Sequence, residues 1–382
     1  MTIDISPSTD MVAVLEHCRV APPPGTVAEK PEIHYMNGDS VSLTFAESNF
    51  DFNYLTGNQA RNGHEFYHLV PQIPEVSSVS NTIVAPLLAL QVTIFPNFGI
   101  CLGYTFHHVT ADGNTLIRFL KSWASITKFG SDEKFLAGGS LPFYDRSTLV
   151  SSKDPKGVEK SLWNQAREMK LNEGEVHYPL TNNVRATFVM GQTHLQRLKK
   201  LVLTRWPTVL HVSTFTVTCA YVWVCLVKSR GASGEKAAGE DEQEDFVCVA
   251  DCRGCFEPPI PETYFGNCLI TCFAAATNSQ LVGEEGLITA AELIGEAIRK
   301  RPRREDGVLE GLETWLLKLG MKCPRRVGVT GSPRLRVYDT DFGWGRPQKT
   351  EIISIDVSGA MSLNECRDSE GDLEVGLSLP KT

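Results

Sequence analysis

The run His107-His108-Val109-Thr110-Ala111-Asp112-Gly113 decides how the rest of this sequence is interpreted. The run begins at the last residue of a β-rich segment, residues 99–107, and is followed by residues 116–126, where apolar side chains recur at helical spacing. A histidine at a strand end, before a glycine turn into a helix, presents its imidazole at the edge of a layer, where clefts form. Histidine is partly neutral near pH 7 and can accept a proton from an attacking hydroxyl group. His108 is therefore a candidate general base, and the alternative is a surface histidine with Asp112 as the N-cap of the helix.

A second run, Asp341-Phe342-Gly343-Trp344-Gly345, places two glycines around a tryptophan. Glycine permits tight backbone turns, so the run predicts a turn around a bulky aromatic anchor. Taken by itself, it indicates a structural loop and no chemistry.

Strand-like and helix-like segments lie on both sides of a loop-rich connection, which predicts an α/β fold with two domains. The expected N-terminal domain covers residues 1–150, the crossover connection 151–185 and the C-terminal domain 186–382. Each domain is expected to hold a mixed β-sheet flanked by helices. The predicted strands are 83–95, 99–107, 184–190, 246–251, 268–274, 334–338, 351–357, 360–365 and 373–379, and the predicted helices are 116–126, 158–169, 193–205, 214–228, 288–299 and 308–319.

Composition narrows the classes of function. The chain has 382 residues, of which 42% are apolar and 21% charged, and its formal net charge is −8. This balance is typical of a soluble globular protein, and the acidic charge argues against nucleic acid or an anionic membrane as a partner. The N-terminus shows no secretory signal, and no apolar run is long enough to span a bilayer. A cytoplasmic protein is therefore expected.

Five of the eleven cysteines cluster in sequence and raise the question of a zinc site. Two of the five have Cys-x-x-Cys spacing. Several of them fall in expected strands, however, and a chain without a secretory signal is expected to keep its cysteines as reduced, buried thiols. No metal site is predicted. The five residues are Cys248, Cys252, Cys255, Cys268 and Cys272.

Together, the histidine run and the distant 341–345 run resemble the paired signature of the BAHD family of plant acyl-CoA-dependent acyltransferases. Both runs occur here in the family's order and at a wide separation. Tyr264-Phe265-Gly266-Asn267-Cys268 resembles the signature of the branch that acts on anthocyanins and phenolic glucosides. Leu87-Leu88-Ala89-Leu90-Gln91-Val92 and Asp251-Cys252-Arg253 also look like that branch. The resemblance covers nearly the whole chain.

The resemblance implies two domains similar to chloramphenicol acetyltransferase, with an active-site tunnel between them. It also implies direct transfer in a ternary complex of the enzyme, an acyl-CoA and a glycoside acceptor. His108 would remove the proton of the acceptor hydroxyl, the oxygen would attack the thioester carbonyl, and CoA thiolate would leave. No permanently bound cofactor, metal or cysteine nucleophile is needed, and the family favours a monomer.

The family also implies supporting roles for residues away from the reacting atoms. Asp112 is expected to form an ion pair with Arg253 and so to hold the His108 loop in shape. The loop of Asp341, Phe342, Gly343, Trp344 and Gly345 is expected near the CoA side, without contact to the reacting atoms. Ser213 and Asn267 are candidates for the tunnel or the CoA path, and simple capping or turn formation is the alternative for both.

The acyl donor and the completeness of the scaffold are two separate questions. Malonyl-CoA is the first expectation for the donor, and hydroxycinnamoyl-CoA is the alternative. Family members carry several dozen residues that have no counterpart after Val27, and the family usually continues beyond the C-terminus seen here. A truncated, non-catalytic relative that only binds a ligand or a partner is therefore the alternative to an active transferase.

Overall fold

The computed structural model describes residues 12–20, 40–73, 77–79, 82–84, 86–133, 136, 141–146, 182–206, 212–232, 239, 241–300 and 325–381, with the backbone alone at 12–20, 77–79, 82–84 and 231–232. The chain forms two compact units. Unit 1 comprises residues 1–111 and 172–185, and unit 2 comprises residues 112–171 and 186–382.

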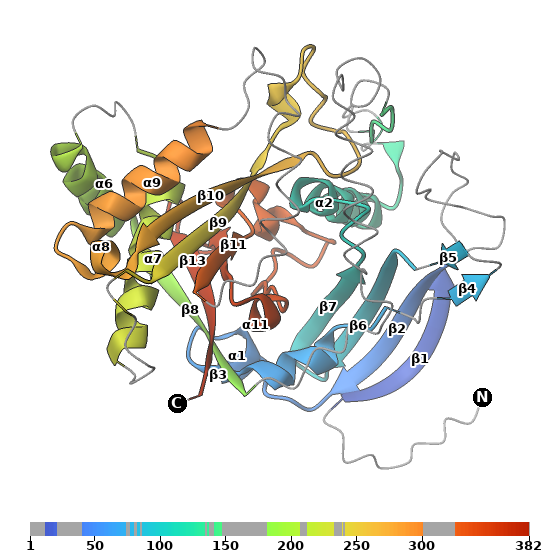
Figure 1. Cartoon of the computed structure of the whole chain (residues 1–382). Helices are drawn as coiled ribbons and strands as arrows, with labels where there is room; N and C mark the ends of the chain where they lie inside the picture. Colours follow the sequence, from blue (N-terminus) through green and yellow to red (C-terminus); the bar gives the residue numbers. More distant parts are fainter. Residues whose placement is uncertain are drawn as a thin grey trace. The chain divides into compact units, whose positions relative to one another are not determined.

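A mixed sheet forms the frame of unit 1, with the strand order β1-β2-β6-β7 among the described residues (Figure 1). β2 runs antiparallel to β1 and parallel to β6, and β6 and β7 form an antiparallel hairpin. Val184 and Arg185, at the start of β8 (Asn183–Met190), pair with β3. The elements of the unit are β1 (Val12–Val20), β2 (Val41–Ser48), α1 (Phe52–Thr56), β3 (Arg61–Asn62), η1 (Gly63–Leu69), β4 (Ser77–Val79), β5 (Thr82–Val84), β6 (Leu88–Phe95) and β7 (Gly99–Phe106).

Tight turns and close backbone packing set the path of β7 toward the histidine run. Asn97 adopts a left-handed φ of 68° in the turn from β6, a conformation that asparagine tolerates better than most residues. Gly103 lies where a Cβ atom would overlap the carbonyl oxygen of Leu69 in η1. Glycine at this position therefore lets η1 pack directly on the strand that leads to His108.

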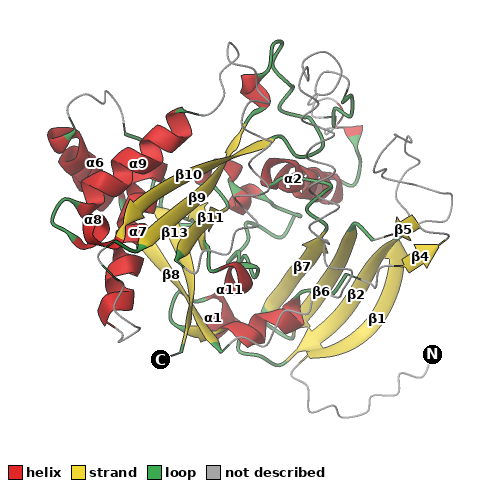
Figure 2. Cartoon of the chain, in the orientation of Figure 1, coloured by secondary structure: helices red, strands yellow, loops and turns green. Residues whose placement is uncertain are grey.

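Unit 2 is built on a larger mixed sheet, whose strands lie in the order β10-β9-β11-β12-β13-β8. β9 and β10 are antiparallel, whereas β11 runs parallel to both β9 and β12. Figure 2 shows the helices α6 to α9 gathered beside this sheet. The elements are α2 (Gly113–Phe129), α6 (Gln192–Arg205), α7 (Thr214–Ala232), β9 (Gln243–Asp251), η2 (Arg253–Cys255), β10 (Leu269–Thr277), α8 (Asn278–Val282), α9 (Gly286–Arg299), β11 (Arg326–Thr330), η4 (Pro333–Leu335), η5 (Val337–Asp339), α11 (Ile355–Ser358), β12 (Met361–Glu365) and β13 (Leu373–Pro380).

The core of unit 2 forms around α7. This helix is largely apolar, and most of its residues between Thr216 and Val227 are buried, whereas Tyr221 and Cys225 are exposed. Trp223 is completely buried, and its ring lies 5.5 Å from that of Phe246 on β9. Replacing such a side chain with alanine costs about 3–5 kcal/mol, so α7 contributes strongly to the stability of this unit.

Most of the predicted elements are confirmed. The β6–β7 hairpin, α2, α6, α7, α9, β8, β9, β10, β12 and β13 all occur within a few residues of their expected bounds. The predicted helices 158–169 and 308–319 lie outside the described residues, as does most of the predicted crossover connection 151–185. The predicted domain boundaries stay predictions.

Two predicted strands are wrong. Residues 334–338 form two short 3-10 turns, because Pro333 and the Ser332 hydroxyl start one turn and Arg336 ends it with a left-handed φ of 50°. Residues 351–357 end in the short helix α11, which stops at Gly359 with a φ of 65°. Both segments contain β-branched and buried residues, and these make the sequence look like a strand although the chain turns.

Candidate functional site

His108 lies in a turn that directly follows β7. The turn is fixed by the His107 carbonyl oxygen, which accepts hydrogen bonds from the Thr110 amide (3.0 Å) and the Thr110 hydroxyl (2.6 Å). The His107 amide in turn donates to the Leu87 carbonyl oxygen (2.8 Å). The His108 side chain is exposed, and its ring centroid lies 5.8 Å from that of Phe106. The strand end therefore presents this imidazole to solvent while its backbone is held on both sides.

Asp112 begins α2 and is completely buried. Its carboxylate accepts the Thr115 amide (2.9 Å), which makes it the N-cap of the helix. It also forms an ion pair with Arg253, with 2.9 Å between Nη1 and Oδ2. A second contact joins Nη2 to Oδ1 at 3.2 Å, so the pair is bidentate. The predicted ion pair is thus present, and its role in holding the His108 loop stays a prediction.

The Arg253 guanidinium group is buried, since only 4% of the side chain is exposed. Burial lowers the pKa of Arg253, but the hydrogen bond and charge of Asp112, together with the charge of Asp251, outweigh burial and raise the pKa above its ordinary value. Asp251 lies 3.0 Å away and is half exposed. Arg253 therefore stays protonated and serves as a fixed counter-ion at the start of α2.

The loop at residues 341–345 folds around the side chain of Asp341. One carboxylate oxygen accepts the amides of Gly343 (2.8 Å) and Gly345 (2.9 Å), and the other accepts the Lys128 ammonium (2.6 Å). Both glycines have a positive φ, 104° and 96°, so the turn favours glycine at each position. The hydrogen bonds from Lys128, Gly343 and Gly345 hold the pKa of Asp341 below its usual range.

Aromatic rings attach the same loop to α2. Phe342 packs edge-on against Trp123 at 5.1 Å and stacks with Trp344 at 6.1 Å. Trp344 itself is 74% exposed. Lys128 and Trp123 are thus the α2 partners of the loop. No local pattern in the sequence indicates this role, because both residues lie more than 200 residues away from the loop along the chain.

The structure places the two remaining site candidates, Ser213 and Asn267, in different settings. The Ser213 hydroxyl accepts the Thr216 amide (3.0 Å), and its backbone carbonyl oxygen accepts the Val217 amide (3.2 Å), which is the geometry of a cap at the start of α7. Asn267 is exposed in the turn before β10. Their placement in the tunnel or along the CoA path stays a prediction.

The five cysteines considered for zinc are all buried, at 2% to 8% exposure. Within the described parts of the chain, no group of three or more histidine, cysteine, aspartate or glutamate residues is arranged to hold a metal ion. Burial raises the pKa of Cys268 to about 12, which keeps this thiol protonated near neutral pH. None of the described helices is long and apolar enough to cross a membrane.

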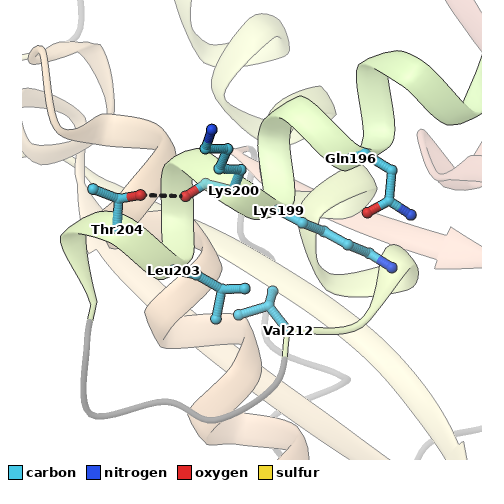
Figure 3. Close-up of a pocket in the computed structure, with 6 residues that line it drawn as sticks. All are labelled: Gln196, Lys199, Lys200, Leu203, Thr204 and Val212. Atoms are coloured by element: carbon cyan, nitrogen blue, oxygen red, sulfur yellow. Dashed lines mark hydrogen bonds between the residues drawn. The ribbon is translucent and has the colours of Figure 1, made fainter.

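A pocket of about 470 Å³ opens on α6 (Figure 3). Leu203 and Val212 form its apolar side, and the Thr204 hydroxyl donates to the Lys200 carbonyl oxygen (2.8 Å). No predicted site residue lines it. The lining residues are Gln196, Lys199, Lys200, Leu203, Thr204 and Val212.

Residues 28–382 match the model of the Transferase family. The chain is 48% identical to phenolic glucoside malonyltransferase 1 from Nicotiana tabacum over 87% of its own length and 73% of the relative's. It is 44% identical to malonyl-coenzyme A:anthocyanin 3-O-glucoside-6''-O-malonyltransferase from Dahlia pinnata, over 94% and 77% of the two lengths.

The fold has a clear counterpart among solved structures. The crystal structure of vinorine synthase superimposes with a TM-score of 0.62, at 20% identity, over 93% of this chain and 77% of that one. At this level of identity the match concerns the fold alone. It agrees with the predicted α/β fold of mixed sheets and helices.

Proposed function

The chain belongs to the BAHD acyltransferase family, and we propose that it transfers an acyl group from coenzyme A to a hydroxyl group of a phenolic or anthocyanin glucoside. Malonyl-CoA is the proposed donor. The observation that carries this proposal is that both relatives described above are glucoside malonyltransferases, matched over 87% and 94% of this chain. The exposed histidine at the end of β7 supplies the chemical group that the reaction requires.

His108 is the proposed general base. Its imidazole takes the proton of the acceptor hydroxyl as the oxygen attacks the thioester carbonyl carbon. A tetrahedral oxyanion forms, and its collapse breaks the bond between carbon and sulfur. The ester is released together with CoA, whose thiolate takes up the proton that the His108 imidazolium gives back, so the base is neutral again. The exposure of His108 supports this role, because a base must be within reach of the incoming hydroxyl group.

Asp112 and Arg253 are proposed to act on the shape of the site and not on the substrate. Both side chains are buried and paired with each other, so neither is available to a reacting atom. The loop at residues 341–345 is proposed to lie near the CoA side. It is held by Lys128 and Trp123, while its exposed Trp344 offers a large apolar surface.

The choice of donor is open to a direct test. Purified wild-type chain, one phenolic glucoside acceptor and a panel of malonyl-CoA, coumaroyl-CoA and acetyl-CoA would be assayed for CoA release and acylated product. We expect the highest kcat/KM with malonyl-CoA. A preference for coumaroyl-CoA would support the hydroxycinnamoyl alternative.

The same assay tests the non-catalytic alternative, which is relevant because the chain covers 73% and 77% of the lengths of the two relatives. Transfer with any donor would refute it. A folded chain that binds CoA or the glucoside but releases no product would refute the proposed transferase activity. Cytoplasmic location and a monomeric state stay predictions.

A further inference from the structure

The Tyr264–Cys268 run, whose residues resemble a branch signature, makes a set of contacts with α2. In the structure its backbone forms the surface on which the first turn of α2 is anchored. The Cys268 amide donates to Asp112 Oδ2 (3.1 Å), and the carbonyl oxygens of Tyr264 and Gly266 face the Thr115 hydroxyl at 3.2 and 2.9 Å. Contacts of this kind depend on the path of the backbone as much as on the identity of the side chains.

Thr115 is the centre of these contacts, and it is 3% exposed. A hydroxyl group donates one hydrogen bond and accepts up to two. The shorter distance favours Gly266 as the acceptor, while Arg253 Nη2 (3.2 Å) donates to the hydroxyl oxygen. Asp112 and Thr115 are three residues apart on one face of the helix, so both reach the same guanidinium group.

The residue types of the run follow from this anchoring role. Gly266 has a φ of 148°, and a Cβ atom there would lie 2.8 Å from the Tyr264 hydroxyl oxygen. Tyr264 is 3% exposed and carries the Arg253 guanidinium over its ring at 5.8 Å. Glycine thus leaves room for the tyrosine, and the tyrosine supports the arginine. Asn267 is the exposed member of the run.

The histidine run is short enough to transmit such an anchor. Only three residues, 109–111, connect His108 to Asp112, and Thr110 and Ala111 are buried. A looser start of α2 would therefore give His108 more freedom, because the chain between them has little slack.

We propose that Thr115 is a positioning residue: its buried hydroxyl fixes the start of α2 to the Tyr264–Cys268 backbone and thereby restricts the chain that carries His108. This inference rests on the proposed transferase function. It assigns the branch signature a structural purpose, namely an anchor for the helix that follows the general base.

The test compares three variants of the full chain in the malonyl-transfer assay. Thr115→Val removes the hydroxyl with little change in volume, and Thr115→Ser retains the hydroxyl. We expect Thr115→Val to lower kcat about tenfold or more with both KM values within about twofold, since a lost buried hydrogen bond of this kind costs positioning and not binding. Thr115→Ser is expected to keep kcat within about threefold of the wild type. Thr115→Ala, a second hydroxyl-free variant, should match valine.

Hydrogen exchange of the same proteins supplies a readout that does not need activity. Amides in residues 107–116 and 264–268 should exchange faster in Thr115→Val than in wild type and Thr115→Ser. Wild-type kcat in Thr115→Val, an equal loss in Thr115→Ser, or unchanged exchange in all variants would overturn the inference. A wild-type chain without transfer activity would instead refute the proposed function, and the exchange data would still decide whether Thr115 is the anchor.

Discussion

Replacing Arg253 with methionine tests whether the buried ion pair stabilises the start of α2. The substitution keeps much of the side-chain length but leaves the Asp112 carboxylate, which is completely buried, without its cation. Breaking a buried pair in this way costs about 3–5 kcal/mol. Asp112 keeps the amides of Thr115 and Cys268 as donors, so we expect the lower end of the range, about 3 kcal/mol.

The assay is urea-induced unfolding followed by tryptophan fluorescence. With a slope of about 3 kcal/mol per molar urea, a loss of about 3 kcal/mol moves the midpoint down by about 1 M. Arg205→Met is the matched control, because it breaks an ion pair with Glu285 in which both side chains are more than half exposed. That variant should lose less than about 1 kcal/mol.

A second variant removes the charge of the carboxylate and keeps the arginine. Asp112→Asn leaves Arg253 with the half-exposed carboxylate of Asp251 at 3.0 Å, so its cost should be smaller, about 1–2 kcal/mol. The double variant should lose less than the sum of the single losses, because the two residues interact directly. If Arg253→Met moved the midpoint no further than Arg205→Met, the stabilising role of the pair would be refuted.

Two more predictions concern pH. The pKa of Asp341 lies below its ordinary value of 3.8, so the contribution of Asp341 to stability is complete above that pH and is lost as the pH falls through the lower pKa of the folded state. The tryptophan emission of the loop should change in this acid range, and Asp341→Asn should abolish the change. An unaltered acid step in the variant would refute the link to Asp341. Burial raises the pKa of Glu365 above 4.5, so the wild type should lose stability as the pH rises from 4.5 through the raised pKa of the folded state. Glu365→Gln should therefore have a higher melting temperature than the wild type at pH 7, and the difference should shrink toward pH 4.5. A melting temperature of the variant below that of the wild type at pH 7 would contradict the reasoning.

Much of the local structure is predictable from the sequence, because periodicity is a local property. The β6–β7 hairpin and α2 show it well: the apolar spacing, the turn at Pro96-Asn97 and the Asp112 cap all lie within the segment that they define. The segments at 334–338 and 351–357 show the limit. Such a segment looks like a strand when only its apolar content is considered, although a proline, a residue with a left-handed φ and a buried side chain make it turn.

In the candidate site, too, local features are predictable from the sequence and long-range contacts are not. His108 is recognisable as a strand-end histidine from its neighbours, and the structure places it there. The partners of Asp112 and Asp341 are 141 and 213 residues away, so no local pattern indicates either ion pair. The Asp112 pair was predicted only through the family resemblance. The Lys128 pair and the Thr115 contacts became apparent only from the folded chain, since they depend on which surfaces the fold brings together.

The most direct test of the central claim is malonyl transfer by His108→Ala, compared with wild type and with His194→Ala, which removes an exposed histidine on α6. Loss of a general base lowers kcat by about 10²–10⁴-fold, so we predict a fall of this size in His108→Ala with an unchanged melting temperature. His194→Ala should retain the wild-type rate. Wild-type turnover in His108→Ala would contradict the assignment of His108 as the general base.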